Sequence, residues 1–379
     1  MSEYQYYEWQ SLERPLTAAE QAAVNGLSSH IDVTSGQAIV TYNWGDFKHD
    51  PIQVLAKYFD AFLYIANWGT RRLAFRFPAG LLDAKAIEPY CDEDHVQIKA
   101  VGGVQVLEFE LSEEEGFEEW MEQRGLLSTL GRLREDILQG DLRALYLAWL
   151  KAMSLESDQY EEDEEDPDNF FNDPEPPLPA GLKQLTPPLK ALADFFEIDL
   201  FLVSAASERS PDLSPSGQTD FAPLISHLTR QECDDFLLKI ANAEPGAVAA
   251  LRKKLLSFGS FPPRPETVAR TFGELLHTAE KLLQAEFRRQ DEAGRKKHLA
   301  EMQELAKHEA RTWQEIENLL QTGSTAGTYD DATALLSRLQ ELSEFQGTQS
   351  GFMIRVRELG ERYRKRTALI ERLKRKGWI

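Results

Sequence analysis

His49 lies between two carboxylates, Asp46 and Asp50, in a segment that also holds two tryptophans and an arginine. A histidine with two nearby carboxylates can bind a metal ion or act as a general base. The same acids have a local explanation, because Asp46 suits a turn and Asp50 suits a helix N-cap. We therefore expect no metal and no cofactor here, and retain catalysis as an alternative interpretation.

The tripeptide Asn-Trp-Gly occurs twice, around Trp44 and around Trp68, and each copy closes a run of β-branched and aromatic residues. Between the copies, Asp50-Pro51 begins a helix, which gives strand, helix, strand. If the two strands are parallel neighbours, both turns lie at one sheet edge, where open α/β sheets bind ligands. The alternative is a strand-end turn whose indole lies in the core. The candidate pocket consists of Trp44, Asp46, His49, Trp68 and Arg71.

The sequence lacks the common catalytic signatures. It has no phosphate loop, no dinucleotide fingerprint, no Gly-x-Ser-x-Gly elbow and no His-Glu-x-x-His. Cys91 and Cys233 are its only cysteines, which excludes a disulfide framework and a Cys-rich zinc site and fits a reducing cytoplasm. The first residues do not resemble a signal peptide, and no apolar run approaches a membrane span, so we expect no membrane contact.

Charge is distributed unevenly along the 379 residues, whose net charge is −21. The segment 156–175 holds eleven acids and no base, whereas 355–376 holds ten Lys/Arg against three Glu, a local charge of +7. The acidic total argues against a general nucleic-acid binder, but the basic tail leaves a local site open. The candidate basic surface consists of Arg355, Arg362, Arg366, Lys374 and Lys376.

Periodicity predicts an α+β fold with a mixed sheet in residues 1–153. Thr17 and Glu20 fit a capping box for a helix from Ala18. Gly102-Gly103 separates two strand-like runs and predicts a hairpin. Helices are expected at about 126–138 and 141–153.

An acidic, proline-rich linker is predicted at 154–181, because low hydrophobicity and high charge keep such a stretch extended. We expect a small helical module at 182–260 and an all-α region at 261–379. In the latter, a long and partly coiled-coil helix runs from about 266 to 320, followed by a hairpin of helices at 329–345 and 352–373. The polar stretch Arg288–Lys297 leaves the continuity of the long helix undecided.

Three segments together resemble a family of bacterial proteins that has no assigned activity. They are the Asn-Trp-Gly region, Leu-Thr-Pro-Pro-Leu-Lys-Ala-Leu-Ala-Asp-Phe at 185–195, and Tyr-Asp-Asp-Ala-Thr-Ala-Leu-Leu-Ser-Arg-Leu at 329–339. The tail is also similar to the tails of SWIM zinc-finger proteins, although the Cys-x-Cys and Cys-x-His ligands of that finger are missing. The resemblance implies a bacterial cytoplasmic setting and transfers no chemistry.

These features favour a non-enzymatic interaction or adaptor protein with a protein partner, since long patterned helices and extended linkers suit partner contact. Two alternatives stay open. One is a nucleic-acid-associated factor that uses the basic C-terminal helix. The other is an enzyme whose pocket lies at the Trp44/Trp68 sheet edge.

Overall fold

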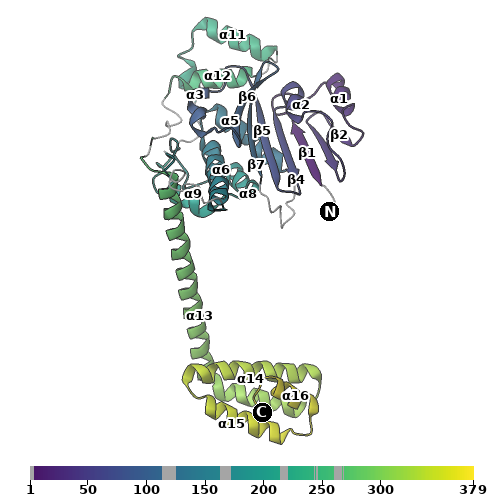
Figure 1. The fold of residues 1–379 in the computed structure, drawn as a ribbon, viewed down its shortest axis with the longest axis vertical. Coiled ribbons are helices and arrows are strands. Elements are labelled where there is room, and N and C mark those ends of the chain that lie inside the picture. Colours follow the sequence, from purple (N-terminus) through teal and green to yellow (C-terminus); the bar gives the residue numbers. More distant parts are fainter. Residues whose placement is uncertain are drawn as a thin grey trace. The chain divides into compact units, whose positions relative to one another are not determined.

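The computed structural model describes residues 4–112, 125–162, 172–213, 221–242, 244, 246–259, 267 and 269–379. The chain divides into two units, Met1–Leu283 and Gln284–Ile379. The first is built on a β-sheet with helices and the second is helical, which confirms the predicted α+β fold class (Figure 1). No described helix combines the length and the apolar character that a membrane crossing needs.

Among the described residues, seven strands form one sheet in the order β2-β3-β1-β4-β5-β7-β6. Every neighbouring pair is antiparallel, so the prediction of a mixed sheet is wrong. The hairpin predicted at Gly102-Gly103 is confirmed as the turn between β6 and β7. The strands are β1 (Gln5–Gln10), β2 (Ile31–Val33), β3 (Gln37–Tyr42), β4 (Ala61–Ala66), β5 (Thr70–Pro78), β6 (Val96–Val101) and β7 (Val104–Ser112).

The first strand of the chain, β1, lies between β3 and β4 and is antiparallel to both. As a result β3 and β4 run in the same direction but are not neighbours, which corrects the predicted parallel pair. Helix α2 (Pro51–Tyr58) connects them, and the Asp50 carboxylate accepts the Ile52 amide at 2.8 Å, as an N-cap should. The Thr17–Glu20 capping box of α1 (Ala18–Asn25) is also confirmed.

Helices cover both faces of the sheet, and each face has its own core. Helix α2 packs on one face, against Phe62 and Val106, because its buried side chains recur on one side. The other face packs on α4 and α6, and its core includes Phe75 and Leu145. The helices after β5 in this layer are α3 (Ala84–Ile87), the short 3₁₀ helix η1 (Glu88–Tyr90), α4 (Leu126–Leu130), α5 (Arg132–Leu138), α6 (Arg143–Glu162), α8 (Pro187–Phe195) and α9 (Leu200–Ser207).

The predicted linker at 154–181 does not divide the structure. Helix α6 continues to Glu162, and the described residues 172–181 pass through the core, where Leu178 is buried. Glu175 meets Arg270 in a buried ion pair at 2.6 Å. Apolar residues among the prolines, such as Leu178, hold this segment in the core. The overall composition of the segment does not reveal them. The most acidic part, 163–171, lies outside the described residues.

The predicted module at 182–260 splits into two parts. Helices α8 and α9 belong to the core beneath the sheet. Helices α10 (Phe221–Ile225), α11 (Arg230–Ala241) and α12 (Ala247–Leu256) pack mainly on one another, and α12 also contacts α5. This second part is called the α10–α12 group below.

The second unit has a separate core. Helix α13 (Phe272–Thr322) is continuous across Arg288–Lys297, which settles the undecided point. Its last turns pack with α14 (Ala326–Gln346), α15 (Gln349–Arg362) and α16 (Thr367–Arg375). The predicted single helix at 352–373 is therefore two helices. The reason is that α16 turns back on α14, where the Trp378 indole donates to the Gln340 side chain at 2.7 Å.

Candidate functional site

The two Asn-Trp-Gly turns lie at the same edge of the sheet, because β3 and β4 run in one direction with β1 between them. Both indoles are exposed: Trp44 keeps 70% of its surface and Trp68 keeps 44%. Both tripeptides follow the end of a strand and close with a glycine of positive φ, as the alternative interpretation predicts, but neither indole lies in the core, so that part of the interpretation is wrong.

The remaining candidate pocket residues lie on opposite faces of the sheet. Asp46 accepts from the Gln5 amide at 2.8 Å on the face that carries α2, and the His49 ring lies against Phe47. Arg71 is buried on the other face, where it donates to the Phe195 carbonyl and pairs with Glu197. Side chains alternate between faces along a strand, so Arg71 cannot meet Asp46. The five residues do not form the predicted pocket.

Three arginines of the predicted basic surface have partners within the second unit. The Arg355 guanidinium lies 4.2 Å from the centre of the Trp313 ring. Arg362 pairs with Glu317 at 2.9 Å, and Arg366 donates to the Gly323 carbonyl at 2.8 Å. Lys374 and Lys376 are exposed on and just after α16. The candidate residues thus lie on α15, on α16 and at the two ends of α16 instead of on one helix.

A cleft in the first unit, which sequence reasoning missed, has a volume of about 540 Å³. It lies between the loop after β1, the start of α5, and the α11–α12 connection. Its lining comprises Leu12, Glu13, Arg14, Arg76, Ser128, Gly131, Arg132, Arg134, Glu135, Ile240, Glu244, Gly246, Ala247, Val248 and Ala249.

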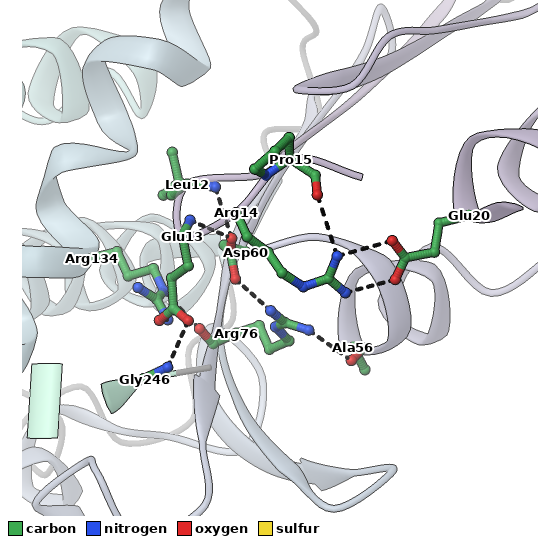
Figure 2. Close-up of polar contacts among 10 residues, drawn as sticks. All are labelled: Leu12, Glu13, Arg14, Pro15, Glu20, Ala56, Asp60, Arg76, Arg134 and Gly246. Carbon is green, nitrogen blue, oxygen red and sulfur yellow. Dashed lines mark hydrogen bonds and ion pairs between the residues drawn. The ribbon is translucent and has the colours of Figure 1, made fainter. Parts of the chain in front are cut away.

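Asp60 organises the polar side of this cleft (Figure 2). Its carboxylate accepts the amides of Leu12 at 2.7 Å and Glu13 at 2.9 Å, and it pairs with Arg76 at 2.6 Å. Burial alone would raise the pKa of Asp60, but the charges of Arg76 and Arg134 and the two amides outweigh it. The pKa of Asp60 therefore lies below its ordinary value, and the carboxylate stays ionised.

Glu13 connects three parts of the fold at the cleft (Figure 2). It lies in the loop after β1, pairs with Arg134 of α5 at 2.6 Å, and accepts the amide of Gly246, just before α12, at 2.8 Å. Gly246 has φ +75°, and a Cβ there would lie 2.5 Å from the Pro78 ring. Close contact with Pro78 thus requires glycine at this position, and the network holds the α10–α12 group on the sheet layer.

The charges of the cleft are mostly matched internally. Arg14 makes two hydrogen bonds with Glu20, at 2.6 and 2.9 Å, and the pairs of Arg76 and Arg134 are described above. Arg132 is exposed, and no ion pair is found for it within the part of the chain that the structure describes. The lining contains neither a histidine nor a cysteine. Its charged side chains are those of glutamate and arginine.

Helix α11, whose last turn reaches the cleft at Ile240, carries several exposed apolar side chains. None of its residues is buried; Leu237 keeps 63% of its surface and Leu238 keeps 62%. Ile240 of α11 and Val248 of α12 are also exposed, and both line the cleft. The helix begins with a capping box of Thr229 and Glu232, which explains its formation without burial.

The sequence held a signal for this surface. Leu237, Leu238 and Ile240 fall within four residues of a predicted helix. Sequence alone could not show that the apolar side of this helix faces away from the core.

No protein-family model, no curated protein and no solved structure matches this chain. Its function is therefore inferred from its own geometry.

Proposed function

We propose that this chain is a non-enzymatic interaction protein that binds a partner protein on the α11–α12 side of the cleft. The observation that carries the proposal is the exposed apolar surface of Leu237, Leu238, Ile240 and Val248. An exposed apolar patch beside a cleft with a polar rim is typical of a protein–protein contact. The reducing setting suggested by the two free cysteines, Cys91 and Cys233, supports a cytoplasmic location as part of this proposal.

The partner is an amphipathic helix of another protein that carries apolar side chains and one carboxylate. Apolar residues at helical spacing would cover Ile240 and Val248, as in the binding of a helix in a groove. Arg132, exposed on the lining, provides the cation for that carboxylate. The other arginines that line the cleft and are described above have their own acids, so a multiply charged ligand such as a nucleotide is not favoured.

Site-specific photo-crosslinking in the native host tests this proposal. A photoreactive amino acid at Ile240 or Val248 should give one discrete adduct, and the same residue at Leu200, an exposed apolar position on α9, should not. The captured segment is then synthesised, and its affinity for the full chain is measured by calorimetry.

Single substitutions then distinguish specific binding at this site from non-specific hydrophobic association. Leu237→Asp and Arg132→Glu should each weaken binding of the captured segment at least about tenfold, whereas Leu200→Asp should not change it. Equal affinity for all three variants contradicts the proposal. Capture of a second copy of this chain instead, with a dimer in analytical ultracentrifugation, also contradicts it.

Association with nucleic acid is a second candidate function, located in the second unit. It is favoured by exposed cations at Arg364, Lys365, Lys374, Arg375 and Lys376. The intramolecular partners of Arg355, Arg362 and Arg366 count against it, because those charges are already engaged. Fluorescence anisotropy with labelled RNA and DNA at low salt tests this candidate, and an absence of binding removes it.

A further inference from the structure

A histidine and two carboxylates converge outside the cleft. Side-chain ligand atoms of Asp92, His95 and Glu156 all lie within 4.8 Å of one another. His95 Nδ1 is 3.4 Å from Asp92 Oδ2 and 3.9 Å from Glu156 Oε1. Asp92 and His95 precede β6, and Glu156 lies on α6, which packs against β6. The sequence hides this group because Glu156 falls within the predicted acidic linker, far from Asp92 and His95 along the chain.

Backbone hydrogen bonds fix the Asp92 carboxylate and the main chain of His95. Asp92 Oδ1 accepts the amides of Asp94 at 2.9 Å, Val96 at 3.1 Å and also His95. This leaves Oδ2 directed toward the imidazole. The His95 carbonyl accepts the Glu110 amide at 2.8 Å, which attaches the loop to β7. Asp92 and His95 are thus held in place before any ligand arrives, as good metal sites require.

The Nδ1 atom of His95 is buried and makes no hydrogen bond within the described residues. Its contact with Asp92 Oδ2 at 3.4 Å is an ion pair when the imidazole is protonated. A ring nitrogen that faces two carboxylates is satisfied by a positive charge, which is either the proton of the imidazolium or a metal ion in its place.

The electrostatic surroundings favour a cation as well. The charges of Asp92, Glu156 and Asp94 all act on the His95 ring. Several acids therefore crowd around one imidazole. A positive ion between them relieves their mutual repulsion.

We propose that Asp92, His95 and Glu156 bind one divalent transition-metal ion of the zinc class, through Nδ1 and one oxygen of each carboxylate. Tetrahedral Zn²⁺ with bonds of about 2.1 Å places its ligand atoms about 3.4 Å apart, which is the observed separation of Nδ1 and Oδ2. Glu156, which is half-buried on a helix, closes the site by a side-chain adjustment. The nitrogen ligand disfavours Mg²⁺ and Ca²⁺, and three protein ligands leave a fourth position for water.

Titration of the full chain with Co²⁺, after removal of any affinity tag, tests the site. We expect one equivalent to bind, with the strong visible absorption of a four-coordinate ion, and Zn²⁺ to displace it. The asparagine in Asp92→Asn keeps one side-chain oxygen that can accept the three amides. It lacks the second carboxylate oxygen, which is the proposed metal ligand. Asp92→Asn and Glu156→Gln should each weaken binding at least about tenfold. His308→Gln removes an exposed histidine 3.2 Å from Glu304 and should leave binding unchanged.

Several results would overturn the site. The first is that neither Co²⁺ nor Zn²⁺ binds at millimolar concentration. The second is that Glu156→Gln leaves the metal affinity unchanged, and the third is that His308→Gln lowers this affinity as much as the ligand substitutions do. A proton on His95 would then account for the charge at Nδ1. Circular dichroism verifies the fold of each variant. If Asp92→Asn unfolds, the substitution Glu156→Gln at its half-buried position decides the matter, together with a zinc-dependent shift of the His95 Nδ1 resonance in ¹⁵N NMR.

Discussion

Glu175 and Arg270 form an ion pair that is almost wholly withdrawn from water, with 0% and 3% of their side chains exposed. The Glu175 carboxylate also accepts the Tyr146 hydroxyl, and Arg270 donates to the Ala205 carbonyl at 3.1 Å. Every polar group at this point has a partner. Such a pair adds little stability over an apolar substitute, but the loss of one member leaves the other charged and buried.

The substitution Glu175→Gln should lower the free energy of unfolding by about 3–5 kcal/mol, because Arg270 keeps its charge without its counterion. Urea denaturation followed by circular dichroism measures the change. The matched control is Asp212→Asn, which removes the exposed pair with Lys183 and should cost no more than about 0.5 kcal/mol. Similar decreases in the free energy of unfolding of the two variants would contradict the prediction that burial of the ion pair sets the cost of breaking it.

Asp136 provides a prediction that depends on pH. Burial, reinforced by the charge of Asp141, raises the pKa of Asp136 to about 6. Since the folded state holds this proton more tightly than the unfolded chain, the group favours folding at low pH, and this contribution is lost as the pH rises through 6. Asp136→Asn should therefore stabilise the protein by about 1 kcal/mol above pH 7, after allowance for solvent screening, and leave it nearly unchanged at pH 4. Thermal unfolding at the two pH values measures this difference.

At the scale of elements, the sequence predicted what depends on neighbouring residues. The caps at Thr17 and Asp50 and the hairpin at Gly102-Gly103 are local, and all are confirmed. The insertion of β1 between β3 and β4 is a contact between distant segments that no local pattern encodes. The candidate pocket failed for the same reason, because the face on which Arg71 lies follows from its register in the sheet.

Gly246, at the start of α12, tests how the α10–α12 group is held. Gly246→Ala should destabilise the protein by about 1–3 kcal/mol, since it adds a Cβ only 2.5 Å from Pro78 to an unfavourable positive φ. Gly80 has a similar φ of +80°, but a Cβ there enters open space, so Gly80→Ala isolates the backbone cost. Chemical denaturation of both variants gives the difference. Equal losses would show that contact with Pro78 does not hold α12.

At the scale of the whole molecule, the division falls inside α13 instead of at the acidic segment. The core beneath the sheet combines residues from both sides of 154–181, such as Phe109 and Phe196. Composition placed the boundary where charge and proline gather, but a few apolar residues in 172–182 decide the packing. A domain boundary depends on which segments of the chain pack into the same core. Charge and proline content along the sequence do not show this packing directly.

Fragments test this division directly. Residues 1–283 and residues 284–379 should each give a cooperative thermal transition, because each contains a complete core. Residues 1–153 should not fold, since they lack Phe195, Phe196 and Leu178. Calorimetry and NMR spectra of the purified fragments measure the outcome. A folded 1–153 fragment would restore the boundary predicted from composition.

Helix α13 packs in a core near each end, and its middle is exposed in the part of the chain that the structure describes. Phe272 and Leu275 are buried near its start and Ile316 and Leu320 near its end, whereas residues 288–301 are exposed. An isolated helix frays from its ends, but here the ends have the strongest tertiary support. Amide hydrogen exchange should therefore be fastest in the middle, around Gly294, and slowest toward both termini. Local unfolding of α13 would therefore begin in the middle of the helix and spread toward its ends.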